Sequence, residues 1–265
     1  MRNIRLLATD LDGTLLRDDK TISLRTRRAL ERVRAVGIEI VLVTGRPPRF
    51  LRTVAEELGI PNIAICGNGA LIYDPTEHTI IRHTPIAPAL AVALVTELRA
   101  AAPGVCFAFE REMVMGCEPG YLTALQRTPP PDILLADALA LCEQPISKLI
   151  AVHPEMPVEA LLPLAQRLAA GRALATYSGA PFVEMSAPEA QKSLALAWLC
   201  AQRGIQPDEV IAFGDMPNDL PMLRWAGHSV AMANAHPDVL AAADEITLSN
   251  EEDGVAVVLE RLFDR

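Results

Sequence analysis

Blocks of apolar residues alternate with amphipathic segments along the first part of the chain, which predicts strands and helices in turn. The predicted strands cover residues 4–9, 38–43 and 63–66, and the predicted helices between them cover residues 24–36 and 49–58. Ser23 is a suitable N-cap for the first of these helices, and Gly37 is a suitable stop. A strand–helix–strand–helix–strand order is typical of a parallel, doubly wound sheet.

The alternation loosens after residue 70. A hairpin is predicted at residues 71–73 and 79–82, followed by helices at 87–101 and 158–170 and by strands at 105–109, 113–116, 148–152, 173–177 and 182–185. Paired strands with few helices between them indicate an α+β module with an antiparallel sheet. We place this module at residues 84–186 and expect it to be an insertion.

The parallel order resumes afterwards. It consists of a helix at 188–203, a strand at 210–213, a helix from Pro221 to 226, strands at 229–232 and 245–248, and a helix at 251–263. The predicted fold is therefore α/β, with a doubly wound, Rossmann-like parallel sheet formed by residues 1–83 and 187–265. The module at 84–186 would interrupt it.

Two carboxylates stand at the end of the first predicted strand. Asp10 and Asp12 are two positions apart, and Gly13 then bends the chain, so both side chains can approach one point. Like charges that lie close together need a cation, a shared proton or a raised pKa. Magnesium, a hard ion with oxygen ligands, is the natural partner. The alternative is that these residues only form a turn.

Other polar residues follow the ends of later predicted strands or lie in a predicted helix. Thr44 and Gly45 follow the second predicted strand, Lys192 lies in a predicted helix, and Asp215, Asn218 and Asp219 follow the strand at 210–213. The carboxyl ends of parallel strands share one edge of a sheet, so we expect these groups to converge. Taken singly, Thr44 could be a helix cap, Lys192 a solvated surface residue, and the acidic residues turn formers.

Composition narrows the classes of partner. The formal charge of −9 argues against nucleic acid and anionic membranes, and 4% aromatic residues offer no obvious stacking surface. Five scattered cysteines without a C-x-x-C pair indicate neither zinc nor disulfides. No signal peptide or membrane span is apparent, so we expect a cytoplasmic protein.

Four motifs together resemble the signatures of the haloacid dehalogenase-like superfamily. They are Asp10-Leu11-Asp12-Gly13-Thr14-Leu15, Thr44-Gly45-Arg46, Lys192, and Gly214-Asp215-x-x-Asn218-Asp219. Their order and spacing are similar to those of the Cof-type phosphatases, which carry a large α/β cap between the second and third signatures. Residues 84–186 would be that cap, which would close over the site and exclude water.

The resemblance implies a role for each residue. Asp10 would be the nucleophile that forms an aspartyl-phosphate, and Asp12 the general acid and base. Mg²⁺ would be held by Asp10, the backbone carbonyl of Asp12 and Asp215, with Asp219 supporting them. The phosphoryl oxygens would be bound by Thr44, Lys192, Asn218 and the backbone N–H groups of Leu11 and Gly45.

Two residues keep open interpretations. Arg46 either contacts the substrate or covers the surface beside it, and Asn68 is more typical of a left-handed turn than of a ligand contact. The expected substrate is a small phosphorylated metabolite, a sugar phosphate or a phosphorylated cofactor. The alternatives are a phosphomutase of the same superfamily and a protein that binds such a metabolite without turnover. The sequence does not indicate the oligomeric state.

Overall fold

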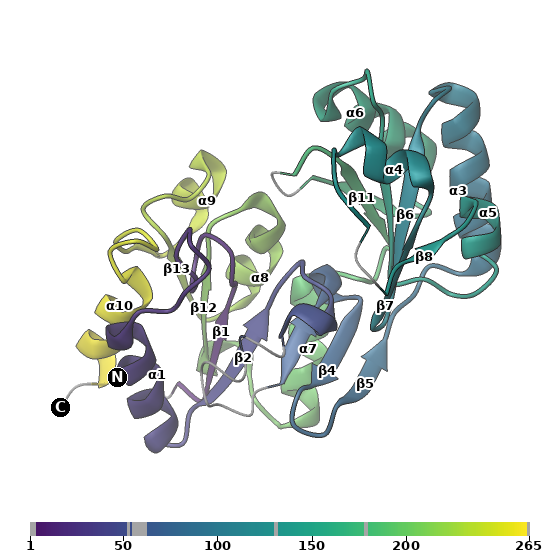
Figure 1. The fold of residues 1–265 in the computed structure, drawn as a ribbon. Helices are drawn as coiled ribbons and strands as arrows, with labels where there is room; N and C mark the ends of the chain where they lie inside the picture. Colours follow the sequence, from purple (N-terminus) through teal and green to yellow (C-terminus); the bar gives the residue numbers. More distant parts are fainter. Residues whose placement is uncertain (1–3, 52–53, 55–62, 130–131, 178–179, 264–265) are drawn as a thin grey trace. The chain divides into compact units, whose positions relative to one another are not determined.

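The computed structural model describes residues 4–51, 54, 63–129, 132–177 and 180–263. The chain divides into two compact units, one formed by residues 1–81 and 191–265 and the other by residues 82–190 (Figure 1). The fold is mixed α/β, as the sequence predicts, with a largely parallel sheet in the first unit and a second sheet in the other.

The first unit is built on an eight-stranded sheet whose strand order is β14-β13-β12-β1-β2-β3-β4-β5. The strands are β1 (Leu6–Thr9), β2 (Glu39–Val43), β3 (Ala64–Cys66), β4 (Leu71–Asp74), β5 (Thr79–His83), β12 (Val210–Gly214), β13 (His228–Ala231) and β14 (Glu245–Ile246). The six strands from β14 to β3 are parallel, and β4 runs antiparallel to β3. Strands β2 to β5 follow one another on one side of β1, and β12 to β14 follow one another on its other side. The order therefore reverses between β1 and β12.

Short helical segments follow most strands of this sheet. The α-helices are α1 (Leu24–Ala35), α7 (Lys192–Gln202), α8 (Leu220–Trp225), α9 (Pro237–Ala242) and α10 (Gly254–Phe263), with 3₁₀ turns η1 (Pro48–Phe50), η2 (Gly67–Gly69), η3 (Pro207–Glu209) and η4 (Pro217–Asp219). The predicted caps of α1 are confirmed: the Ser23 hydroxyl accepts the Thr26 N–H at 3.0 Å, and Gly37 has φ +85°. Most of the helix predicted at 49–58 lies outside the described residues.

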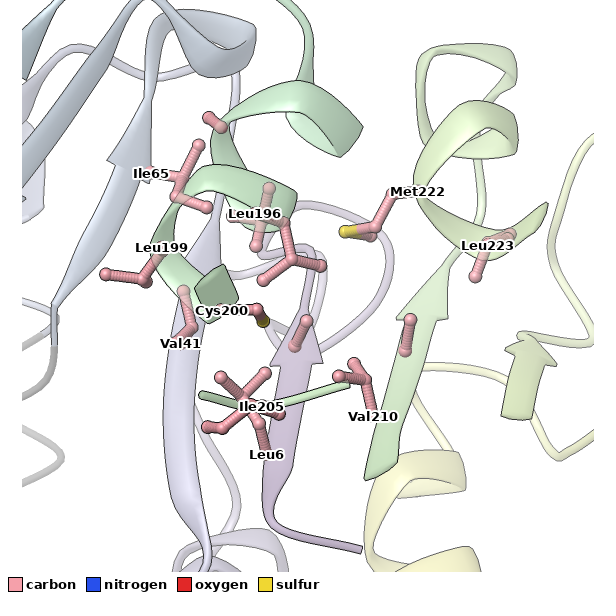
Figure 2. Packing of buried hydrophobic residues seen from close by; sticks show 14 of the residues in the cluster. Leu6, Val41, Ile65, Leu196, Leu199, Cys200, Ile205, Val210, Met222 and Leu223 are labelled. Atoms are coloured by element: carbon pink, nitrogen blue, oxygen red, sulfur yellow. The ribbon is translucent and has the colours of Figure 1, made fainter. Parts of the chain in front are cut away.

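Aliphatic side chains form the core on the face of the sheet that carries α7 and α8. Leu6, Val41 and Val210 from three neighbouring strands meet Leu196 and Leu199 of α7, all buried (Figure 2). The intervening residues of the same strands, such as Leu7 and Leu42, are buried as well. Burial on both faces explains why these strands read as continuous apolar runs.

The second unit contains a six-stranded sheet of order β10-β11-β9-β6-β7-β8, antiparallel except for the pair β7 and β8. Its elements are α3 (Pro88–Ala101), β6 (Cys106–Arg111), β7 (Val114–Cys117), α4 (Pro119–Ala124), β8 (Leu134–Leu135), α5 (Ala138–Leu141), β9 (Lys148–Val152), α6 (Val158–Ala169), β10 (Leu174–Thr176) and β11 (Val183–Ser186). The predicted module, residues 84–186, lies inside this unit.

Some predicted boundaries are wrong. α7 begins at Lys192 rather than at residue 188, because Gln191 keeps an extended backbone. α10 begins at Gly254 rather than at 251, after a turn that closes onto the Ser249 carbonyl. The short elements α4, α5, α9 and β8 were not predicted, because two to six residues are too few to show a periodicity.

Over the described ranges, no helix combines the length and apolar character that a membrane crossing requires. All five cysteines are free thiols, and four of them are buried.

We predict that a buried ion pair contributes strongly to the stability of the second unit. Lys148 and Glu184 form a salt bridge with side chains only 4% and 8% exposed. Lys148→Ala should destabilise the protein by about 3–5 kcal/mol, because Glu184 loses this partner while it is buried. The double variant Lys148→Met/Glu184→Leu should lose less. Urea denaturation measures both.

The exposed pair of Arg172 and Glu97 in the same unit is the matched control. Arg172→Ala should cost less than about 1 kcal/mol, because solvent screens that pair. Equal losses for Lys148→Ala and for the double variant would contradict the prediction, since the loss of the Lys148 charge beside a buried carboxylate would then not be the cause.

Candidate active site

The candidate site lies at the carboxyl ends of β1 and β12, where the strand order reverses. Asp10 follows β1 and Asp215 follows β12, and both side chains are buried. One carboxylate oxygen from each, together with one from Asp219, lies within 4.8 Å of the others. The predicted convergence of acidic residues from distant parts of the sequence is thus present in the structure.

Lys192 joins this group from the first residue of α7. Its ammonium Nζ donates to Asp10 Oδ1 at 2.6 Å and to Asp219 Oδ1 at 2.7 Å, and the residue is 2% exposed. The interpretation as a solvated surface lysine is therefore wrong. Burial works against the charge on Lys192, yet the two carboxylates outweigh it and raise its pKa.

The acidic side chains are held in place by different partners. Asp219 Oδ2 accepts the backbone N–H groups of Asp215 and Met216 at 3.1 and 3.0 Å. Asp215 Oδ1 accepts the Thr14 hydroxyl at 2.6 Å. Both oxygens of Asp219 are therefore engaged. Within the described ranges, no hydrogen bond reaches Oδ2 of Asp10 or Oδ2 of Asp215, so these two oxygens remain available to a ligand.

The electrostatics of this cluster favour a cation. Burial raises the pKa of Asp215 to about 6 and raises that of Asp10 well above its ordinary value. Three ionised carboxylates and one ammonium would leave two negative charges in a buried place. A divalent ion with oxygen ligands offsets that charge, and the donor set suits Mg²⁺. The residues present therefore fit a magnesium site.

Asp12 points to a different set of partners. Arg46 donates from Nε to Asp12 Oδ2 at 2.6 Å and from Nη2 to Oδ1 at 2.5 Å, and Lys20 Nζ lies 3.0 Å from Oδ1. The Asp12 side chain is 41% exposed. Burial alone would raise the pKa of Asp12, but the hydrogen bonds from Arg46 and Lys20 outweigh it and lower the pKa.

The loops after β2 and β3 are joined by hydrogen bonds around Asn68. The Asn68 N–H donates to the Thr44 carbonyl at 3.0 Å, and its side-chain oxygen accepts from Asn218 Nδ2 at 3.1 Å. Asn68 has φ +59°, so the predicted left-handed turn is present, and its side chain also lies beside Gly45. The Thr44 hydroxyl accepts the Arg46 N–H at 3.1 Å.

The structure thus arranges the predicted residues in three sets. Asp10, Asp215, Asp219 and Lys192 form one buried cluster; Asp12 and Arg46 form an ion pair; Thr44, Gly45 and Asn218 surround Asn68. Leu11, which separates Asp10 from Asp12 in the sequence, is fully buried. Its carbonyl accepts the Leu16 N–H at 2.8 Å.

Three contributing residues carried no assigned role in the sequence analysis. Thr14 belongs to the quoted first motif, so its position could have suggested a site function. Lys20 lies eight positions after Asp12 and has φ +69°. This turn conformation accompanies its contact with Asp12 and is not evident from the sequence between them. The contact of the Asn68 side chain with Asn218 spans 150 positions and has no local sequence signal.

Comparisons with known proteins give matches over nearly the whole chain. The family model for haloacid dehalogenase-like hydrolases matches residues 7–259. The phosphatase YwpJ of Bacillus subtilis is 30% identical over 297 residues, covering 98% of this chain and all of that protein. The pyridoxal phosphate phosphatase YbhA of Escherichia coli is 30% identical over 271 residues, covering 95% and 96%.

A solved structure shows the same fold. The crystal structure of a haloacid dehalogenase-like hydrolase from Bacteroides thetaiotaomicron superposes with a TM-score of 0.82 at 29% sequence identity. The match covers 98% of this chain and all of the other.

We predict that Gly13 is required for the position of Asp215. Gly13 has φ +77°, and a Cβ added there would lie 2.4 Å from Asp215 Oδ2. Gly13→Ala should therefore displace this carboxylate and weaken Mg²⁺ binding at least several-fold, as measured by isothermal titration calorimetry.

Gly37→Ala separates this effect from backbone strain. Gly37 also has a left-handed φ, +85°, but nothing lies within 4 Å of the added Cβ. Both variants should lose about 1 kcal/mol of stability from the backbone conformation. Equal Mg²⁺ affinity in the two variants would show that the close approach to Asp215 is unimportant.

Proposed function

The chain belongs to the haloacid dehalogenase-like hydrolases and is a phosphatase, and we propose that it hydrolyses a small phosphorylated metabolite through an aspartyl-phosphate, with Mg²⁺ as cofactor. The observation that carries this proposal is the buried position of Asp10, which contacts the Lys192 ammonium at 2.6 Å and has a carboxylate oxygen within 4.8 Å of one from Asp215. A carboxylate beside fixed positive charge can meet a phosphoryl group whose own negative charge needs compensation.

In the first step, an Asp10 oxygen attacks phosphorus in line with the leaving oxygen. The bond from phosphorus to that oxygen breaks as the bond to Asp10 forms, and Asp12 supplies a proton to the leaving alkoxide. Asp12 is ionised when paired with Arg46 and Lys20, so it must first take up a proton. The negative phosphoryl group of an incoming substrate raises the pKa of Asp12 and favours that uptake.

In the second step, Asp12 has become a carboxylate and acts as a base. It takes a proton from water as the water oxygen attacks phosphorus, and the bond between phosphorus and Asp10 breaks. Inorganic phosphate leaves, and Asp10 returns to its ionised form. The partial exposure of Asp12 supports this role, because the group must exchange protons with water in every cycle.

The remaining residues of the site would stabilise the negative charge of the phosphoryl group. Thr44, Lys192, Asn218 and the backbone N–H groups of Leu11 and Gly45 would donate to the phosphoryl oxygens. Mg²⁺ would be held by Asp10, the backbone carbonyl of Asp12 and Asp215, and it would offset negative charge on the phosphoryl group. Asp219 would support the metal site without binding the ion directly. This role agrees with its two oxygens, which already accept hydrogen bonds from Lys192 and from the Asp215 N–H.

The substrate class follows from analogy and composition. Relatives at about 30% identity include a phosphatase of a phosphorylated cofactor, pyridoxal phosphate. The inserted unit, residues 82–190, would act as a cap that closes over a small substrate.

A net charge of −9 argues against nucleic acid and anionic membranes as partners, and we propose a cytoplasmic location. A phosphomutase shares this chemistry, and no observation here favours it over hydrolysis.

We predict that Asp10→Asn abolishes turnover while the protein stays folded. The amide is nearly isosteric but is a poor nucleophile, so hydrolysis of 4-nitrophenyl phosphate should fall by about 10⁴-fold or more. Asp238→Asn, at an exposed position, is the matched control and should retain full activity. Near-normal turnover by Asp10→Asn with an unchanged circular dichroism spectrum would exclude Asp10 as the nucleophile.

We predict that activity depends on a divalent cation. Treatment with EDTA should remove phosphate release, and added Mg²⁺ should restore it. Asp215→Asn should need more Mg²⁺ for half-maximal activity, because it removes one charged ligand. Full activity of the metal-free protein, verified by elemental analysis, would contradict the proposed coordination.

A further inference from the structure

We propose that Arg46 is a positioning residue, which holds the carboxylate of Asp12 for proton transfer, and is not a contact for the substrate. This inference rests on the proposed function, because it assigns Arg46 a part in the steps that Asp12 performs. It concerns the orientation of Asp12 in the first unit, and it gives Arg46 a role that is neither of the two interpretations stated from the sequence, a substrate contact or a cover of the surface.

The contact is two-pointed and short. Arg46 Nε and Nη2 reach the two oxygens of Asp12 at 2.6 and 2.5 Å, which is the parallel, fork-like geometry that a guanidinium forms with a carboxylate. Two contacts fix the plane of the carboxylate as well as its distance, whereas one contact leaves it free to rotate. Asp12 thus engages Nε and Nη2 of Arg46 and sets the direction of the guanidinium.

The backbone of Arg46 is itself anchored. Its N–H donates to the Thr44 hydroxyl at 3.1 Å, and its carbonyl accepts the Gly67 N–H at 3.0 Å. Thr44 is almost completely buried at the end of β2. The side chain of Arg46 therefore extends toward Asp12 from a fixed backbone. Its contacts can restrain the orientation of the Asp12 carboxylate, which is half-exposed and lies in the neighbouring loop.

Lys20 completes an asymmetric arrangement around Asp12. Oδ1 is contacted by both Arg46 Nη2 and Lys20 Nζ, whereas within the described ranges Oδ2 accepts only from Arg46 Nε. One lone pair of Oδ2 is thereby left for the proton that Asp12 exchanges with water or with the leaving group. The geometry assigns Oδ2 as the reacting oxygen and Arg46 as the residue that presents it.

The test separates the two half-reactions with 4-nitrophenyl phosphate. Its leaving group needs little help from an acid, so the first step proceeds without a well-placed Asp12, whereas attack of water on the aspartyl-phosphate still needs the base. Arg46→Ala should release about one equivalent of nitrophenolate in the first turnover and then slow at least tenfold in the steady state. KM should change less than threefold. Rapid-mixing spectrophotometry measures both phases.

Three variants serve as references. Asp12→Asn should show the same burst and a slower steady state, and Asp12→Asn/Arg46→Ala should be no slower than Asp12→Asn alone, because both changes remove one function. Arg46→Lys keeps the charge without the fork and should recover less than half of the loss. Arg49→Ala changes an arginine in the same loop that stacks on Phe50, and it should leave every rate unchanged.

Specific outcomes would overturn the inference. A rise in KM with unchanged kcat in Arg46→Ala would identify a substrate contact, and a further loss on top of Asp12→Asn would show an independent role. Full recovery by Arg46→Lys would exclude the two-point requirement. Arg46→Gln is measured in parallel, so that a folding defect in the alanine variant does not decide the result. If Asp12→Asn shows no slowed steady state, the assigned role of Asp12 fails, separately from that of Arg46.

Discussion

The compensation of buried negative charge governs the organisation of the first unit. Three carboxylates meet at the edge of a parallel sheet, where surrounding apolar strands exclude water and raise the pKa of Asp10 and Asp215. Lys192 supplies the fixed positive charge, and its contacts join α7 to Asp10 and to Asp219. Such a cluster is stable only when each charge has a partner, and this need explains why its residues suit a metal ion.

The sheet topology brings these residues together with little help from local sequence. Asp10 and Asp215 are separated by 205 positions, yet β1 and β12 are neighbours, so residues after both strands share one edge. This part of the site was predictable, because apolar strand runs followed by polar residues are visible in the sequence. The close approach of Gly13 to Asp215 adds a steric reason for glycine at that point.

Other parts of the site were not predictable from local patterns. The partner of Asp12 depends on the direction of a long arginine side chain 34 positions away, and the contact of Lys20 accompanies a left-handed turn residue. The start of α7 was placed four residues early, because residues 188–191 have no strong helix-breaking signal after Pro188. Its true start at Lys192 puts the ammonium in the first turn of the helix, beside the acidic loop.

The two carboxylates of the first motif differ in environment in a way that matches their assigned chemistry. Asp10 is buried and held by Lys192, which suits a nucleophile that must attack from one fixed position. Asp12 is 41% exposed and is held by Lys20 from its own loop and by Arg46 from the loop after β2, which suits a group that must exchange a proton with water in each cycle. Because a half-exposed carboxylate lacks the restraint of close packing, it needs another source of order. The anchored fork of Arg46 provides that order without burying Asp12.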